Sequence, residues 1–372
     1  MRRTLIHVVP SGEWGGPERY AFDICRYFNA CGWDVRVLTR DARAVDRPFE
    51  QAGIRVSHAP LRQYPDYYSA REMARLFAGT PEGEGIVHVH RYNDALTCIL
   101  ARRLARRPDI RLVATRHKAE RGRDSLLRRI IYRGLDSQLF VSEFSKEIFY
   151  SGWAPGRSPL SEKKTAVTYN SFFHSSEAPY PDPEKGPVAA AYRGKLKPGK
   201  GLETLIDAFA LLRKSKIRLR IMGKGHPDYV DALRRRAQMA GVADQIDWHR
   251  ETDFTEDQMR SVHFGVLPSD EPEAFGMANL EFMACGRPQI STFSGAEKEM
   301  LIPGVDSLMV ARGDARALAD AILTLASDAS LRAEMGRHAF DRYAALFAWP
   351  SFIERLTPQY IPENGLQPTV SP

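Results

Sequence analysis

Short apolar runs alternate with longer segments in which apolar residues recur every three or four positions along the first half of the chain. The short runs predict buried strands, and the longer segments predict amphipathic helices. Strands and helices that alternate in this way form a parallel sheet covered by helices on both faces. The predicted strands are 4–10, 34–40, 54–60, 86–91, 111–117, 137–142 and 165–170, and the predicted helices are 17–32, 93–107, 126–135 and 143–152.

A second alternating series follows the segment 177–187, whose four prolines mark it as a linker between two domains. We therefore predict an α/β protein with two doubly wound, Rossmann-like domains. Ligands bind at the carboxyl ends of the strands in such sheets, so the cleft between two facing sheets is the expected site. The predicted strands are 187–194, 218–223, 245–250, 264–269, 288–292 and 306–311. The predicted helices are 201–215, 228–241, 255–262, 277–285, 315–328 and 330–347, before a tail, 357–372, that we expect to be frayed.

The composition supports two soluble domains. A chain of 372 residues exceeds the usual size of one core, and no apolar run approaches the roughly 20 residues of a membrane-spanning helix. The four cysteines (25, 31, 98 and 285) show neither CxxC nor a Cys/His metal spacing, so we expect reduced thiols and a cytoplasmic protein.

The net charge of +7 is concentrated in the first part of the chain. Residues 1–183 contain 29 Lys and Arg against 21 Asp and Glu, whereas the remainder contains 24 against 25. The excess is dense in 102–111 and in the helix-like 121–134, where Leu and Ile alternate with Arg. Such a helix can lie on an anionic membrane surface, here the inner face, or it can be a solvated helix whose apolar face is core. Nucleic acid is the less favoured partner.

The segment 268–288 carries the strongest candidate chemistry. Its opening predicts a loop and 277–285 a helix, which places Glu273 before the helix and Glu281 inside it. A carboxylate can accept two hydrogen bonds from a diol, and a helix N-terminus favours anions. The pair would thus suit a ligand with hydroxyls and phosphates, although two solvated surface carboxylates would show the same spacing.

The whole segment closely resembles the donor-site signature of retaining GT-B glycosyltransferases of family 4, also called group 1. The matching residues are Ser269, Glu273, Phe275, Gly276, Glu281, Met283, Ala284, Gly286 and Pro288. The resemblance implies that Glu273 binds the donor sugar, that Glu281 binds the ribose diol, and that Phe275, Gly276 and Met277 belong to the donor site.

Three further motifs resemble landmarks of the same family. In 192–201, Lys195 and Lys200 stand where the family contacts the donor phosphates, although Lys195 replaces the usual Arg. Gly223 and Gly225 match a loop near the nucleotide. The turn 10–20 carries Gly15 and Gly16, which match the loop that faces donor phosphates and acceptor.

His117 ends a predicted strand, where a histidine is often structural. The resemblance places it near the reacting sugar, as a hydrogen-bonding group rather than a nucleophile. Glu273, His117 and Lys200 are accordingly the predicted catalytic residues. The family also implies a GT-B fold, with domains at 1–183 and 184–341 and a C-terminal helix, about 342–372, that crosses back onto the first domain.

The implied activity is transfer of a sugar from a nucleotide-sugar donor, with UDP favoured over GDP, to a glycan or lipid-linked acceptor with retention of anomeric configuration. A bacterial surface polysaccharide or lipopolysaccharide is the expected product class. No D-x-D triplet ends a strand, so we expect no metal, and the nucleotide-sugar is a co-substrate rather than a cofactor. The alternatives are a sugar-nucleotide epimerase of the same architecture and a non-catalytic protein that binds nucleotide or nucleic acid.

Overall fold

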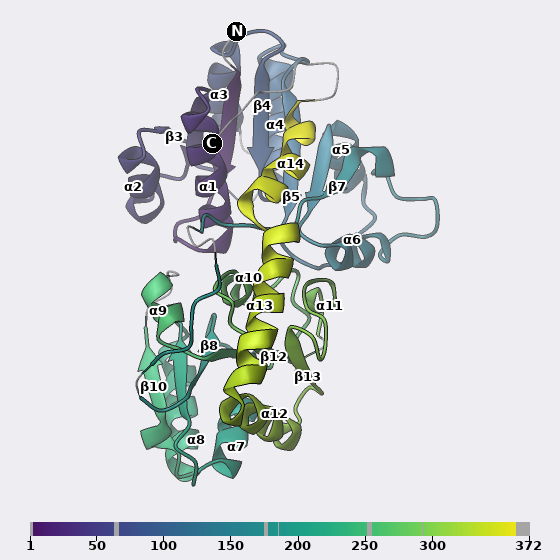
Figure 1. The fold of residues 1–372 in the computed structure, drawn as a ribbon. Helices are drawn as coiled ribbons and strands as arrows, with labels where there is room; N and C mark the ends of the chain where they lie inside the picture. The colour runs from purple at the N-terminus through teal and green to yellow at the C-terminus, as the bar shows by residue number, and fades with distance from the viewer. Residues whose placement is uncertain are drawn as a thin grey trace. The chain divides into compact units, whose positions relative to one another are not determined.

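The computed structural model describes residues 3–62, 67–174, 178–184, 186–250, 255–292 and 294–361. The chain divides into two compact units (Figure 1): unit 1 comprises Met1–Phe173 with Trp349–Pro372, and unit 2 comprises His174–Ala348. Each unit contains one parallel sheet, of seven strands in unit 1 and six in unit 2. The predicted α/β class with two Rossmann-like sheets is confirmed.

The sheet of unit 1 has the strand order β3-β2-β1-β4-β5-β6-β7, with every pair parallel. The strands are β1 (Thr4–Val9), β2 (Asp34–Thr39), β3 (Arg55–His58), β4 (Gly85–Val89), β5 (Arg111–Arg116), β6 (Ser137–Phe140) and β7 (Thr165–Val167). The helices are α1 (Gly16–Ala30), α2 (Arg43–Gln51), α3 (Tyr67–Ala78), α4 (Tyr92–Leu104), α5 (Leu126–Gly134), α6 (Glu143–Tyr150) and α14 (Trp349–Tyr360), with a 3₁₀ turn at Glu162–Lys164.

Residues of β1 point alternately into two apolar cores, one on each face of the sheet, because successive strand side chains face opposite sides. Leu5 and Val9 pack in the core that contains residues of α1, α2 and α14. Ile6 and Val8 pack in the core that contains residues of α3, α4 and α6. The C-terminal helix α14 is therefore part of the hydrophobic core of unit 1.

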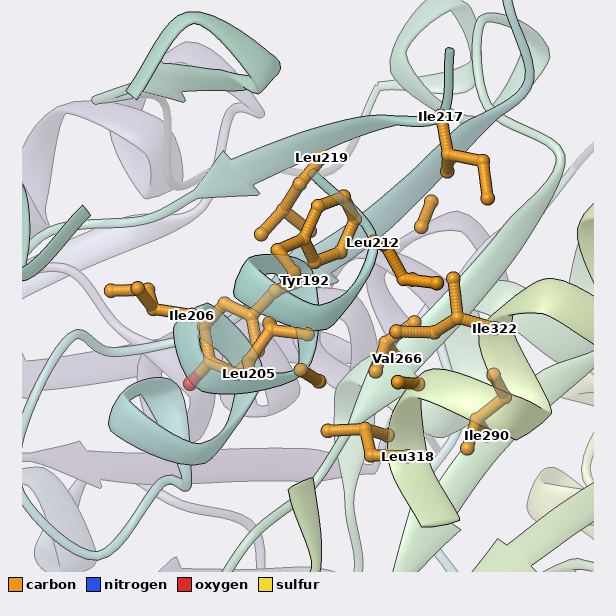
Figure 2. Packing of buried hydrophobic residues seen from close by; sticks show 14 of the residues in the cluster. Tyr192, Leu205, Ile206, Leu212, Ile217, Leu219, Val266, Ile290, Leu318 and Ile322 are labelled. Atoms are coloured by element: carbon orange, nitrogen blue, oxygen red, sulfur yellow. The ribbon is translucent and has the colours of Figure 1, made fainter. Parts of the chain in front are cut away.

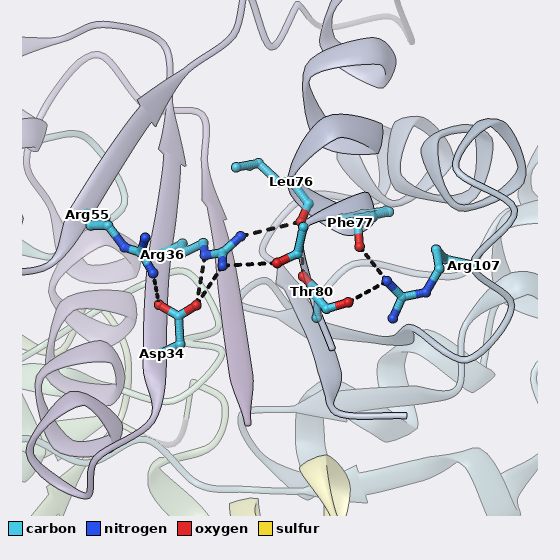
Figure 3. Close-up of polar contacts among 8 residues, drawn as sticks. Asp34, Arg36, Arg55, Leu76, Phe77, Thr80 and Arg107 are labelled. Carbon is cyan, nitrogen blue, oxygen red and sulfur yellow. Dashed lines mark hydrogen bonds and ion pairs between the residues drawn. The ribbon is translucent and has the colours of Figure 1, made fainter. Parts of the chain in front are cut away.

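Helices α2 and α3 lie between predicted strands and were not predicted. The C-terminal end of α3 is fixed by two arginines from elsewhere in unit 1, which satisfy carbonyls that a helix end leaves without intrahelical partners. Figure 3 shows Arg36 of β2 donating to the carbonyl of Leu76 and Arg107 donating to that of Phe77. The same arginines also donate to the carbonyls of Gly79 and Thr80, which follow the helix. Arg36 and Arg55 also pair with Asp34. Part of the basic excess in the first half of the chain thus has a structural role.

The sheet of unit 2 has the strand order β10-β9-β8-β11-β12-β13, also parallel. Its core surrounds Tyr192 of β8 and includes Leu205 and Ile206 from α7 and Leu318 and Ile322 from α12 (Figure 2). The strands are β8 (Ala189–Arg193), β9 (Arg218–Met222), β10 (Ile246–His249), β11 (Phe264–Leu267), β12 (Gln289–Thr292) and β13 (Ser307–Val310). The helices are α7 (Leu202–Leu211), α8 (Pro227–Met239), α9 (Glu256–Arg260), α10 (Met277–Ala284), α11 (Glu297–Met300), α12 (Ala315–Ser327) and α13 (Ala329–Leu346), with a 3₁₀ turn at Ala243–Gln245.

The proline-rich segment interpreted as a linker packs within unit 2 in its described part. The buried Arg287 donates to the carbonyl of Tyr180 at 3.3 Å and to that of Pro181 at 2.9 Å. The unit boundary accordingly falls at residues 173 and 174, ten residues before the predicted one. Composition could not show this, because the anchoring arginine lies about 100 positions further along the chain.

The crossing helix expected at about 342–372 is two helices. Helix α13 continues to Leu346 in unit 2, and α14 begins at Trp349 in unit 1. Residues 357–360, which we expected to be frayed, form the last turn of α14, where Tyr360 is buried. Residues 362–372 lie outside the described part of the chain.

Candidate functional site

Unit 2 contains a cavity of about 260 Å³ at the carboxyl ends of β8 and β11, the position at which parallel α/β sheets bind ligands. Its walls come from the β8–α7 loop, the β11–α10 loop and the first turns of α10 and α11. The lining residues are Tyr192, Arg193, Gly194, Lys195, Lys197, Lys200, Leu267, Ser269, Glu273, Gly276, Met277, Ala278, Asn279 and Glu297.

The two loops are held together by backbone contacts that require glycine. The carbonyl of Gly199 accepts hydrogen bonds from the backbone N–H groups of Asp270 and Glu271, each at 3.0 Å. Gly201 has φ +68°, and a Cβ there would lie 1.7 Å from the carbonyl oxygen of Pro268. A side chain at this position would push the loops apart, so Gly201 fixes the distance between the lysines of one loop and the carboxylates of the other.

Glu273 and Lys200 form an ion pair inside the cavity. Ser269 donates a second hydrogen bond to the same carboxylate oxygen of Glu273, at 3.1 Å. The side chains of Glu273 and Lys200 keep 27% and 18% of their exposure, so both remain accessible to a ligand. The sequence motif and the lysine loop, about 70 residues apart, therefore converge on one anion–cation pair.

Glu281 lies one turn into α10, where its carboxylate forms a two-point ion pair with the guanidinium of Arg193 at the end of β8. Both side chains are largely buried. Arg193 lines the cavity, whereas Glu281 is outside its lining. The two-point contact with Arg193 fixes the orientation of the Glu281 carboxylate.

Gly276 is the residue before α10 and has φ +97°, so the chain enters the helix through a left-handed turn. Gly276 and Met277 line the cavity, which places the N-terminus of α10 against it. Phe275 is buried and packs edge-on against Phe347, with ring centroids 6.0 Å apart. Phe275 thus anchors the loop by packing in the core and is outside the cavity lining.

The remaining predicted residues of unit 2 occupy different positions. Lys195 lines the cavity and is exposed. Gly223 and Gly225 are outside its lining. A Cβ at Gly223 would lie 1.9 Å from the carbonyl oxygen of Gly194, and one at Gly225 would lie 2.1 Å from that of Leu196. The two glycines allow the β9–α8 loop to pack on the backbone that carries Lys195.

The cavity also contains a carboxylate that we did not single out in the sequence. Glu297 begins α11 and is almost fully buried, and it accepts a hydrogen bond from Ser294 at 2.7 Å. Burial raises its pKa. It lies in the segment SGAEKE, and nothing in the sequence distinguishes a buried glutamate in a first helical turn from an exposed one.

The predicted residues of unit 1 lie at the carboxyl ends of its strands. Gly15 is the N-cap of α1 and Gly16 is the first residue of that helix; a Cβ at Gly16 would meet no atom within 4 Å. His117 follows β5 and is half-buried, next to His90, with Nε2 and Nδ1 of the two rings 3.1 Å apart. Burial lowers the pKa of His117 to about 4, so its imidazole is neutral at pH 7.

The surface of unit 1 around α5 combines exposed apolar and basic side chains. Leu126, Leu127 and Ile130 are exposed by 78%, 47% and 41%. The apolar face of this helix is therefore only partly core, with Ile131 as a core residue. Five exposed arginines lie nearby in the sequence: Arg103, Arg106, Arg121, Arg123 and Arg133. None of the helices in the described ranges has the length and apolar character to cross a membrane.

Comparison with protein families finds two matches that lie on the two units. Residues 15–153 match the glycosyl transferase 4-like domain, and residues 188–328 match glycosyl transferases group 1. The second match contains the whole cavity described above.

Full-length relatives and solved structures agree with the family matches. A D-inositol 3-phosphate glycosyltransferase of Arthrobacter sp. (strain FB24) is 24% identical over 92% of this chain and 90% of its own. A GDP-mannose-dependent alpha-(1-6)-phosphatidylinositol monomannoside mannosyltransferase of Mycolicibacterium smegmatis is 28% identical over 83% of this chain and 84% of its own.

A glycosyltransferase from Rickettsia africae ESF-5 superimposes with a TM-score of 0.80 at 17% identity, covering 96% of this chain and 98% of its own. HepE of Anabaena, solved in complex with UDP, gives 0.77 at 18% identity, covering 95% and 98%. The fold is thus that of the GT-B glycosyltransferases. The chain belongs to the group 1, or family 4, glycosyltransferases and uses a nucleotide-sugar donor.

Proposed function

We propose that this enzyme transfers a hexose from a UDP-sugar to a glycan or lipid-linked acceptor with retention of anomeric configuration. The observation that carries the proposal is the Lys200–Glu273 pair inside the cavity of unit 2, beside the N-terminus of α10. A cation and a helix N-terminus suit a diphosphate, and an accessible carboxylate suits sugar hydroxyls.

Each residue then has a defined part in donor binding. Lys200, with Lys195 beside it, neutralises the diphosphate as it leaves with negative charge, which lowers the barrier to breaking the sugar–phosphate bond. Glu273 accepts hydrogen bonds from the sugar. Glu281 accepts from the ribose diol with the lone pairs that Arg193 leaves available.

Unit 1 contributes the acceptor side and His117 in this proposal. Gly15 and Gly16 at the start of α1 allow close backbone approach to the donor phosphates. His117 hydrogen-bonds the transferred sugar. No metal ion takes part, because the lysines and the helix N-terminus supply the positive charge.

Two of the similar proteins differ in the nucleotide that their names or structures carry. HepE was solved with UDP, whereas the Mycolicibacterium relative is named as GDP-mannose-dependent. A thermal-shift panel of UDP, GDP, ADP and dTDP with their sugar conjugates tests the proposal. We expect UDP and one UDP-sugar to raise the melting temperature by several degrees. A response to GDP alone would show that the donor is a GDP-sugar instead of a UDP-sugar. No response to any nucleotide would contradict the proposal.

A sugar-nucleotide epimerase of the same architecture is the second candidate, because it would use the same donor cavity. Incubation of the responding UDP-sugar with the enzyme alone separates the two activities. Interconversion to the epimer without an acceptor would identify an epimerase, whereas the proposed transferase leaves the sugar configuration unchanged.

Lys200→Ala is expected to weaken UDP binding about 10- to 100-fold, the range for losing one charge-assisted contact. Binding of uridine, which has no phosphates, should stay unchanged. Isothermal titration calorimetry of both ligands provides the measurement. Lys214→Ala serves as the matched control, because Lys214 is exposed in the same unit and lies outside the cavity lining. Equal UDP affinity in wild type and Lys200→Ala would exclude the phosphate role of Lys200.

We further propose that the surface around α5 attaches the enzyme to an anionic membrane, which would present a lipid-linked acceptor. Leu126, Leu127 and Ile130 would enter the interface while the neighbouring arginines meet anionic headgroups. We expect the protein to sediment with phosphatidylglycerol-containing vesicles at low salt and to be released at high salt.

The triple change of Leu126, Leu127 and Ile130 to Ser should abolish this sedimentation. Replacing Leu211, which is 48% exposed in unit 2, provides the control. Sedimentation equal to that with pure phosphatidylcholine vesicles would remove the membrane proposal.

A further inference from the structure

Four histidines of unit 1 gather on one face of its sheet. They are placed there by the period of two along adjacent strands. On β1, His7 shares a face with Leu5 and Val9, which pack in the core that contains α14 residues. On β4, His88 is the parallel neighbour of His7 and His90 follows on the same face. Thr115 and His117 occupy the corresponding face of β5 and its end.

Seven side chains on this face form one continuous hydrogen-bonded chain. Its first half runs from Tyr20 to Thr115 (3.3 Å between hydroxyl oxygens), to His88 Nε2 (2.7 Å), and from His88 Nδ1 to the hydroxyl of Tyr360 (2.6 Å). Its second half runs from Tyr360 to His7 Nε2 (3.4 Å), from His7 Nδ1 to His90 Nε2 (3.1 Å), and from His90 Nδ1 to His117 Nε2 (3.1 Å). Tyr360, on the last turn of α14, is the link between the two halves.

The imidazoles of this chain are neutral at pH 7. Burial lowers the pKa of His7 to about 3 and that of His117 to about 4. The pKa values of His88 and His90 also lie well below the usual value, because of burial and then the neighbouring imidazoles. A neutral imidazole has one donor and one acceptor nitrogen.

His88 and His7 are the only hydrogen-bond partners of the Tyr360 hydroxyl among the described residues, so this hydroxyl donates one of its two bonds and accepts the other. With this condition, two proton arrangements satisfy every link. If Thr115 donates to His88, then each ring accepts at Nε2 and donates at Nδ1 along the chain, so His117 carries its proton on Nδ1. If His117 donates to His90, each ring carries its proton on Nε2 and the direction is reversed throughout. In either case all four histidines have the same tautomer.

We propose that this hydrogen-bonded chain couples the tautomer of His117 to those of His7, His88 and His90, with Tyr360 of the C-terminal helix as a positioning residue that links the two halves of the chain. The nitrogen that carries the proton on a histidine is fixed by the hydrogen bond made at the other nitrogen, and here that bond belongs to a chain of seven groups. The consequence for catalysis rests on the proposed function, in which the free Nδ1 side of His117 meets the transferred sugar.

A shared metal ion is the competing interpretation of the same histidines. One ligand nitrogen from each of His7, His88 and His90 lies within 4.8 Å of the others. However, all six ring nitrogens of these residues already have hydrogen-bond partners within the chain. Metal binding would have to break at least two of these bonds, so the geometry favours the hydrogen-bonded chain.

Two-bond ¹H–¹⁵N spectra of the full-length, ¹⁵N-histidine-labelled protein at pH 7.5 test the proposal, with signals assigned by single His→Gln variants. We expect His7, His88, His90 and His117 to show the same tautomer population. Different tautomers among the four histidines would overturn the proposed coupling. Displacement of the His7, His88 and His90 signals by one equivalent of Zn²⁺ would also overturn it, in favour of a metal site.

Tyr360→Phe removes the linking hydroxyl and keeps the aromatic packing. We expect the tautomer population of His88 to separate from that of the other three, and that of His117 to shift from its wild-type value. Tyr132→Phe is the matched control, because Tyr132 is a buried tyrosine of α5 that is not part of the hydrogen-bonded chain. An unchanged His117 signal in Tyr360→Phe would contradict the linking role of Tyr360.

Activity separates this inference from the proposed function. For the same variant we expect kcat to fall about tenfold with little change in the KM for the donor, the upper end of the effect of losing one neutral hydrogen bond. The tautomer measurement needs neither donor nor acceptor. Coupled tautomers without any transferase activity would contradict the proposed function alone, whereas an active Tyr360→Phe enzyme with unchanged kcat would overturn the positioning role.

Discussion

Glu273→Gln is expected to lower the rate of sugar transfer by about 10²- to 10³-fold while UDP binding is retained. The substitution keeps the shape of the side chain but removes its charge. Hydrogen bonds to charged groups each contribute about 1.5–3 kcal/mol, and two sugar hydroxyls bound by Glu273 would account for a loss of this size. The charge also stabilises the cationic character that a sugar acquires as its bond to the leaving group breaks. Initial rates at saturating donor, combined with calorimetry of UDP, provide the measurement.

Glu271→Gln is the matched control for this experiment. Glu271 lies two residues away in the same loop and pairs with Lys197 at 2.9 Å, but it is exposed and outside the cavity lining. We expect this variant to retain near wild-type turnover. If Glu273→Gln also retained it, the carboxylate would have no part in the reaction and the donor orientation proposed here would be wrong.

Lowering the pH from 7 to 5 is expected to reduce the free energy of unfolding of unit 1 by about 2 kcal/mol through His7 alone. In the unfolded chain this residue takes up a proton below pH 6.5. In the folded protein it remains neutral, because burial holds the pKa of His7 at about 3. The unfolded state therefore binds more protons across this range, so stability is present above pH 6.5 and falls as the pH decreases.

Denaturant unfolding at pH 7, 6 and 5 measures this change. Asp23 and Asp94 oppose it, because burial raises their pKa values in the folded state. A comparison with His7→Gln cancels this contribution, and the variant should lose about 2 kcal/mol less than wild type between pH 7 and pH 5. Equal losses in the two proteins would show that His7 gains its proton before unit 1 unfolds.

The sequence was sufficient for the fold class because strands such as 4–10 and 218–223 are short apolar runs between amphipathic segments. It was insufficient for α2 and α3, since α3 ends at carbonyls that are satisfied by Arg36 and Arg107 from distant positions. It also failed for the segment around Tyr180, where proline content suggested a linker but burial against Arg287 holds the segment in unit 2. Long-range polar contacts of this kind leave no local pattern.

For the candidate site, too, the sequence predicted some residues and missed others. The motif around Glu273 and the loop of Lys200 were each visible as sequence patterns, and the structure brings them into one cavity. The burial of Glu297 depends on the packing of α11 and was not visible. Of the four histidines, only His117 was singled out in the sequence. Their meeting depends on β1, β4 and β5 being neighbours in the sheet, which is a property of topology.

The position of α14 in the core of unit 1 has a consequence for synthesis of the protein. Unit 2 is one continuous stretch, so it can complete its core while the chain is still being translated. Residues 4–167, which carry all the strands of unit 1, are made first but lack Phe352, Leu356 and Tyr360 until these residues leave the ribosome. During this interval the incomplete core exposes an apolar face to which chaperones can bind. A premature stop codon before residue 349 would accordingly damage unit 1, although all its strands would already have been translated.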